Sequence, residues 1–270
     1  MKKIISNILI CSVMFLSYGC SKNNEKKPEI SVPFTTTIGT TTTQELTNET
    51  TSSFIAKDEV QSLNNQYSDI LFDEKNFNLS DYRDSDLFTP YESVAKSFAD
   101  IGPVPIEAQL EFLTDVIARV KVVNNNGGFN FNARWRVAGP EDAVTVWSSV
   151  EVEFTDVYYG DEVKNNIVEI IHEGGVFENQ LYNYAQFTEE MEVGAEYLVF
   201  LKNFIAPGES LNGKENNKYS IQTLDGFIKI KDGKSSISNK KIDIANFRSN
   251  VDINKIIDYS SKMIKILKNK

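Results

Sequence analysis

Apolar and polar residues alternate along much of the middle of the chain, and this alternation predicts a domain rich in β-strands. Residues 115–123 place Val and Ala at every second position, which is the period of a half-buried strand. Residues 144–159 repeat the pattern, and their apolar phase slips by one residue at 155–157, where we expect a bulge or a sharp bend. The run 197–204 is almost entirely apolar, so it predicts a strand buried on both faces, with Phe200 packed against the apolar face of 144–159.

Shorter segments of strand composition follow, and turn signals separate them. The Asn- and Gly-rich run 124–128 is expected to end the first strand, and Gly174-Gly175 to end another. Asp225-Gly226 and Asp232-Gly233 are each expected to form a two-residue hairpin turn. The shorter strands are expected at residues 167–171, 219–224, 227–231 and 234–237. Strands of this number and spacing predict a mainly β fold, a small five- or six-stranded OB-like barrel with a few flanking helices.

Three segments carry the spacing or the end signals of helices. Residues 105–114 place Ile and Leu on one side, and residues 250–268 carry a longer apolar stripe whose terminal lysines suit the helix dipole. Thr89-Pro90-Tyr91-Glu92 provides an N-cap, a first-turn proline and an acidic third position. We therefore expect a further helix from this segment to Gly102, where glycine favours a helix end.

The N-terminus has a basic start, an apolar stretch and then an abrupt change to polar residues. Lys2 and Lys3 precede residues 4–18, of which 11 of 15 are apolar. As a helix this stretch would reach about 22 Å, against roughly 30 Å for the hydrocarbon core of a bilayer. It is therefore typical of a signal peptide rather than of a membrane span. Gly19-Cys20 follows it directly.

This arrangement, with a small residue before Cys20, resembles the lipobox of bacterial lipoproteins, although Ser17 stands where that family usually has Leu. The resemblance implies that a diacylglyceryl group is attached to the sulfur of Cys20 and that the chain is cleaved between Gly19 and Cys20. Two acyl chains hold a protein stably on a membrane, so the resemblance implies a location at the extracytoplasmic face of the cell membrane. An ordinary secretory signal with a chance cysteine, or an uncleaved anchor, remain the alternatives.

The residues after Cys20 are rich in Thr and carry almost no periodic apolar pattern. Such a composition does not bury enough apolar area to offset chain entropy, so we expect a disordered tether, with a polar edge strand as the alternative. The expected organisation of the chain is a signal peptide at 1–19, a tether at 20–53, a partly helical extension at 54–103, a β-barrel domain at 104–249 and a C-terminal helix at 250–270.

The segment Gly194-Ala195-Glu196-Tyr197-Leu198-Val199-Phe200-Leu201 adds a second resemblance. Together with the order of the strands before it and with Gly226 to Gly233 after it, this segment is similar to an OB-like module of uncharacterised surface proteins of Gram-positive bacteria. The resemblance covers about half of the chain. It implies a fold and a surface location, and it brings no catalytic residues.

Composition and charge narrow the classes of function. Lys and Arg number 28 against 38 Asp and Glu, which gives a formal net charge of −10. Such a surface repels a polyanion, so we expect no binding to nucleic acid. The two cysteines both lie within the first 20 residues, and His172 is the single histidine. A disulfide framework, a thiolate metal site and a paired-histidine metal site are therefore excluded beyond residue 20, and we expect no metal and no cofactor.

Two sets of residues suggest catalysis, and each also has a structural interpretation. His172 next to Glu173 has the residue types of an acid–base pair, or it is a histidine at the end of a strand before a glycine turn. Glu151 and Glu153 would lie about 7 Å apart on one strand face, a spacing compatible with glycoside hydrolysis. They are equally compatible with a solvated strand face.

Aromatic residues provide the candidate ligand surface. Trp135 stands between Arg134 and Arg136, a combination that can stack on a base or a sugar. The tyrosines of this candidate surface, which could bind carbohydrate or peptide or could pack at the rim of the barrel, are Tyr158, Tyr159, Tyr182 and Tyr184.

The function expected from these observations is that of a membrane-anchored extracellular lipoprotein. Its non-catalytic β-barrel domain would bind a protein, a peptide or a cell-wall component. The alternatives are an extracellular hydrolase that uses paired carboxylates, and a regulator or inhibitor of a process in the cell envelope.

Overall fold

The structure is a computed structural model, and the residues that it describes lie between Thr50 and Lys270. These residues are 57–73, 92–95, 104–137, 144–161, 167–183, 190–209, 218–222, 226–238 and 245–268. The signal peptide, the lipid site at Cys20, the tether and Tyr184 lie outside them. Among the helices described, none is both long enough and apolar enough to cross a membrane.

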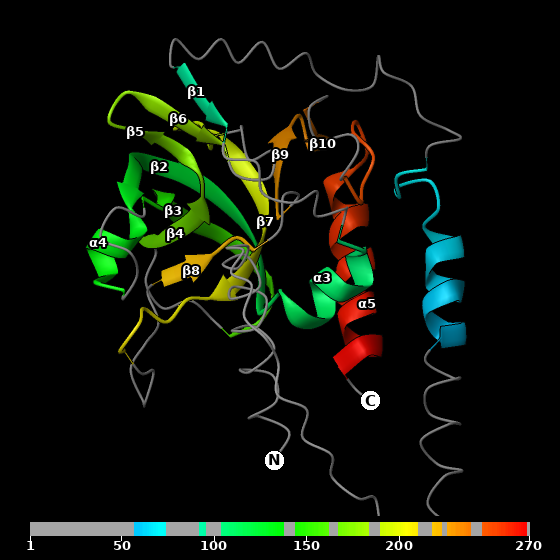
Figure 1. The fold of residues 1–270 in the computed structure, drawn as a ribbon. Helices are drawn as coiled ribbons and strands as arrows, with labels where there is room; N and C mark the ends of the chain where they lie inside the picture. The colour runs from blue at the N-terminus through cyan, green and yellow to red at the C-terminus, as the bar shows by residue number, and fades with distance from the viewer. Residues whose placement is uncertain are drawn as a thin grey trace, which may run out of the picture. The chain divides into compact units, whose positions relative to one another are not determined.

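Five strands close into a ring (Figure 1). The strands of the ring are β2 (Val116–Asn130), β3 (Val146–Tyr159), β4 (Ile167–Glu173), β7 (Glu196–Asn203) and β8 (Lys218–Ser220). Their order is β7-β2-β3-β4-β8, and β8 pairs back with β7. Every pair in the ring is antiparallel except β4 with β8. This arrangement confirms the mainly β, OB-like fold class predicted from the sequence.

The inside of the ring is filled by every second residue of its strands, as the period of two requires. Side chains from β2, β3, β4 and β7 form one apolar cluster there. Its fully buried members include Ala118, Val120, Val152, Ile170, Met191, Tyr197, Val199 and Leu201. The alternation predicted for residues 115–123 and 144–159 is thus the alternation that fills the ring.

Irregular pairing lets β2 and β3 stay together over their full length. The register shifts between Arg119 and Val120, which lie opposite Asp156 and Phe154, so the bulge predicted at residues 155–157 is confirmed. The predicted end of the first strand at 124–128 is wrong, because β2 continues to Asn130 through two further register shifts. Gly127 has a φ of 73°, and its amide donates to Asn125 Oδ1 at 2.8 Å. The glycine thus absorbs the irregularity that would otherwise end the strand.

One of the two predicted hairpins is present. Strands β9 (Phe227–Lys231) and β10 (Lys234–Ser236) pair antiparallel around Asp232 and Gly233, whose φ angles of 52° and 74° are those of a left-handed hairpin turn. The hairpin predicted at Asp225-Gly226 is wrong. The strands before and after that position, β8 and β9, do not pair with each other, because both pair with β7. Strand β9 pairs with the first half of β7, and β8 pairs with the end of β7.

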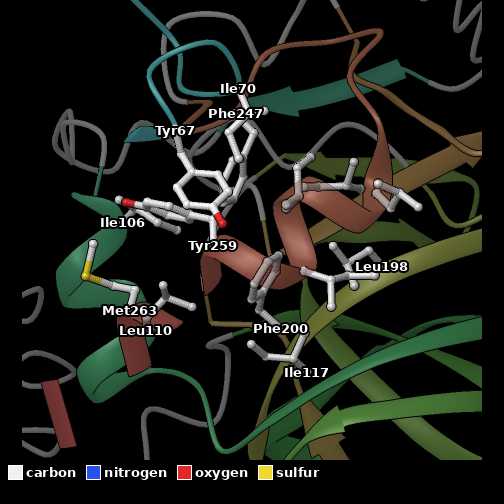
Figure 2. Close-up of a cluster of buried hydrophobic side chains, with 14 of the residues drawn as sticks. Tyr67, Ile70, Ile106, Leu110, Ile117, Leu198, Phe200, Phe247, Tyr259 and Met263 are labelled. Carbon is white, nitrogen blue, oxygen red and sulfur yellow. The ribbon is translucent and has the colours of Figure 1, made fainter. Parts of the chain in front are cut away.

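Helices cover one outer face of the ring and build a second core. Helix α3 (Ile106–Phe112) and helix α5 (Ile253–Lys268) pack against each other, which confirms the helices predicted at 105–114 and 250–268. Figure 2 shows Ile117, Leu198 and Phe200 of the ring pointing toward these helices.

Phe200 belongs to this second core and not to the inside of the ring. It is 1% exposed, and its ring stacks on Phe247 with centroids 6.1 Å apart. The predicted burial is therefore confirmed, but the predicted packing against the face of 144–159 is wrong. In an alternating strand, Leu198 and Phe200 face the helices while Tyr197 and Val199 face the inside of the ring.

Residues 57–73 are part of the same core. Residues 57–66 form a helix, and Leu63, Tyr67 and Ile70 are buried against α5 and its neighbours. The Tyr259 hydroxyl donates to Asn64 Oδ1 at 2.8 Å, and Lys262 Nζ donates to the Tyr67 hydroxyl at 2.7 Å. The expected boundary at residue 104 therefore does not separate an extension from the domain.

Residues 92–95, which the sequence predicts to lie in a helix from Thr89 to Gly102, belong instead to a small second sheet. Strand β1 (Glu92–Ala95) pairs in parallel with β6 (Gln180–Asn183), which pairs with β5 (Gly175–Phe177). The helix prediction is wrong for these residues because the backbone of β6, distant in sequence, pairs with their own backbone. Tyr182 and Phe177 of this sheet pack with Val146 of β3.

The core between the ring and the helices predicts large losses on truncation. Phe200→Ala is expected to lower the free energy of unfolding by about 3–5 kcal/mol, and Ile70→Ala by about 2–5 kcal/mol, because each leaves a cavity at a site no more than 1% exposed. Denaturant unfolding measures both losses, with Val193→Ala, at a 62% exposed site, as the control. An unchanged Ile70→Ala variant would contradict the membership of residues 57–73 in the core.

Candidate functional site

The outer face of strands β3 and β4 carries the candidate site. Because neighbouring residues of a strand point to opposite faces, the residues that alternate with the ring interior point outward. Across β3 and β4, Trp147 lies opposite Glu173, and Glu151 lies opposite Glu169. This outer face thus combines an indole ring with three carboxylates.

Helix α4 (Phe131–Trp135) contacts this face through Phe131, which packs on Trp147, and through Arg134, which pairs with Glu169. It follows β2 directly, and its N-terminus is capped by Asn130, whose Oδ1 accepts from the amide of Ala133 at 3.3 Å. Arg136, with a φ of 52°, ends it in the left-handed conformation. The local sequence therefore stops β2, forms one short helix and turns the chain back toward β3.

Four aromatic rings join α4 to the ring of strands, and we call them the aromatic cluster: Phe131, Trp135, Trp147 and Phe204. The centroids of Phe131 and Trp147 are 4.7 Å apart, and those of Trp135 and Phe204 are 5.7 Å apart. These distances lie in the favourable range for aromatic pairs. Trp147 is 8% exposed, and the other three rings are half-buried. The cluster contains both tryptophans of the chain.

Arg134 connects α4 to the acidic part of the face. Its Nη2 lies 2.6 Å from Glu169 Oε1, and the Ser149 hydroxyl donates to the same oxygen at 2.6 Å. The guanidinium also lies 4.4 Å from the centroid of Phe129 and 4.8 Å from that of Trp135. The arginine therefore makes a charge-assisted hydrogen bond and cation–π contacts at the same time.

A second cation reaches Trp135 from strand β8. Lys218 is the register partner of Glu169 in the parallel pair β4–β8, and its Nζ lies 4.6 Å from the centroid of the indole. The amide of Phe204 donates to the carbonyl of Lys218 at 3.1 Å. This bond places the Phe204 backbone beside the lysine that contacts the indole.

Two features of the contact between α4 and this face are unfavourable. The Nε1 of Trp135 is buried, and it has no hydrogen-bond partner among the described residues; a buried donor left unpaired costs about 1–3 kcal/mol. Glu151 and Glu169 are direct neighbours on adjacent strands, and like charges in that position repel. Arg134 offsets the repulsion by pairing with Glu169.

The structure separates the side chains of His172 and Glu173, whereas Glu151 and Glu153 share the outer face of β3. His172 is 3% exposed and faces the inside of the ring, where its imidazole lies 6.3 Å from the ring of Phe227. Glu173 points to the opposite, outer face, opposite Trp147. The Nδ1 of His172 lies 3.1 Å from the backbone carbonyl oxygen of Glu173 and not from its carboxylate. Adjacency in sequence thus places the two side chains on different faces of β4.

The predicted ligand surface divides into separate places. Tyr158 and Tyr159 lie at the other end of β3 from Trp147 and pack against the helical core, with Lys268 Nζ 5.1 Å from the centroid of Tyr159. Tyr182 packs with Phe177 in the small sheet, and its hydroxyl donates to Gln180 at 3.2 Å. Of the predicted surface residues that the structure describes, Trp135 alone belongs to the aromatic cluster.

Sequence reasoning missed most of the cluster. Trp147 alternates with the apolar residues that fill the ring, at positions of β3 that are otherwise mostly polar. An aromatic residue on this mostly polar face is the sequence signal that could have indicated the cluster. Phe204 and Lys218 border a connection between strands, where nothing in the sequence relates them to Trp135.

No protein-family model matches the chain, and no curated protein matches it. Within the described residues, no three His, Cys, Asp or Glu side chains are grouped to hold a metal ion. The described residues of the candidate site provide aromatic contacts, cation–π contacts and charge.

Burial at this face predicts a pH-dependent stability. Burial raises the pKa of the Glu173 carboxyl, so the protonated carboxyl favours the folded state. The contribution of Glu173 to stability is present below the pKa that its carboxyl has in the unfolded state. It is lost as the pH rises through the higher pKa that the carboxyl has in the folded state. Glu173→Gln is expected to be more stable than wild type at about pH 7, and this advantage is expected to disappear near pH 4.

Thermal unfolding at the two pH values measures this difference. Glu153→Gln, at an exposed position of β3, provides the control. A Glu173→Gln variant less stable than wild type at about pH 7 would contradict the effect of burial.

Proposed function

We propose that the chain is a lipoprotein, held at the extracytoplasmic face of the cell membrane by a diacylglyceryl group on Cys20. We further propose that its ring domain binds an extracellular protein, peptide or cell-wall component without catalysing a reaction. The anchor is supported by the apolar stretch 4–18, by Gly19-Cys20 and by the polar residues that follow. Two acyl chains would make the attachment stable.

The aromatic cluster is the observation that carries the binding role. In OB folds, ligands bind on the face of the second and third strands and at the loops after the first and fourth strands. In the ring, α4 lies after the first strand and Phe204 after the fourth, and Trp147 lies on the second. Aromatic rings and cations thus meet where this fold class binds its ligands.

The charge of the chain restricts the ligand. A net charge of −10 repels nucleic acid, and it favours neutral or basic partners. A lipid anchor followed by a long polar segment would present the domain to molecules of the cell envelope.

The anchor is tested with Cys20→Ala, since lipid attachment requires the sulfur of Cys20. Wild type is expected to enter the detergent phase after phase separation, whereas Cys20→Ala is expected to be released or to keep its signal peptide. Cys11→Ala, in the apolar stretch, is the matched control and is expected to behave as wild type. Equal partitioning of wild type and Cys20→Ala, both without the signal peptide, would contradict the lipoprotein assignment.

A further inference from the structure

We infer that α4 is an intramolecular occupant of the outer face of β3 and β4, and that this face takes in its place a basic, aromatic peptide segment of a partner protein. The inference names the ligand class for the proposed binding function and therefore rests on it. It is carried by the match between the side chains of α4 and the face beneath them.

The acidic part of the face requires a cation. Glu151 and Glu169 are cross-strand neighbours, and Arg134 pairs with Glu169 from above. If α4 leaves without a replacement, the two carboxylates lose this compensation and repel each other. A segment that displaces α4 must therefore bring its own guanidinium or ammonium group.

The aromatic part of the face requires a flat apolar group beside that cation. Trp147 and Phe204 receive Phe131 and Trp135 of α4. Phe131, Arg134 and Trp135 stand three and four positions apart, so they share one side of a helical turn. The face thus recognises aromatic and cationic groups separated by about one helical turn.

Helix α4 is an occupant that can be displaced. Five residues are too few for a helix to be stable without its tertiary contacts, and the side chains of Arg134 and Glu169 remain 33% and 19% exposed. The Nε1 of Trp135 finds no partner in the described parts of the chain. The formal charge of −10 also attracts a basic segment over a longer range.

The test measures binding of a fluorescein-labelled peptide with the sequence of residues 129–137 to the full-length chain in detergent, by fluorescence anisotropy. Binding to wild type is expected to be weak, because tethering gives α4 a high effective concentration on the face. Arg134→Gln weakens the attachment of α4 to the face, because it removes the ion pair with Glu169. The peptide keeps both of its arginines. This variant is expected to bind the peptide about fivefold more tightly, the factor that loss of a half-exposed ion pair allows.

A second substitution added to Arg134→Gln shows where on the domain the peptide binds. Adding Glu169→Gln to Arg134→Gln is expected to abolish the gain, because the peptide arginine then loses its carboxylate. Adding Glu196→Gln is expected to leave the gain unchanged. This residue also pairs with an arginine at 2.6 Å, but that arginine is Arg119, which lies outside the site. Equal affinities of wild type and Arg134→Gln, or a gain that survives Glu169→Gln, would overturn the inference.

A parallel titration separates this inference from the proposed function. Both tryptophans of the chain belong to the aromatic cluster, so their emission reports a glycan bound at the face. The peptide brings its own tryptophan and is followed by the anisotropy of its label. A response of wild type to neutral cell-wall glycan, with no response of any variant to the peptide, would overturn the peptide class and support the binding function. No response to either probe would count against the binding function itself.

Discussion

Strand β7 is the element on which the rest of the domain depends, because it must be covered on both faces. Tyr197 and Val199 fill the inside of the ring, while Leu198 and Phe200 fill the core beneath the helices. The same strand pairs with β2 along one edge and with both β8 and β9 along the other. Because residues 197–201 of this strand are all apolar, they are buried only when both layers form, the closed ring on one side and the helices on the other.

The sequence predicted the elements that depend on local periodicity. The alternating strands, the bulge at 155–157, the hairpin at Asp232-Gly233 and the amphipathic helix α5 all follow from spacing of residues near one another in the chain. The failures have distant causes. Strand β1 forms because β6 pairs with it, and β9 pairs with β7 instead of turning back on β8. The local sequence signals for a helix or a turn contain no information about partners that are distant in the chain.

The candidate site was predictable only in part, for the same reason. Trp135 is conspicuous in the sequence between two arginines, but its partners Phe204 and Lys218 are distant from it in sequence. The tyrosines at 158 and 159 were grouped with it because they are aromatic. The length of β3 separates them from it, since Tyr159 pairs near the start of β2 and Trp147 near its end. Residue type suggested the chemistry, and only the strand register decided which groups meet.

The contact between residues 57–73 and α5 has a consequence for how the domain is assembled as the chain is synthesised. Tyr67 and Lys262 are hydrogen-bonded, yet 195 positions separate them in the chain. The surface that buries the apolar side chains of this early segment is thus incomplete until α5 follows, and closing so large a loop slows folding. Leu63, Tyr67 and Ile70 lack their contacts with α5 throughout that interval. The core beneath the ring is therefore completed only when the last described helix joins this early segment.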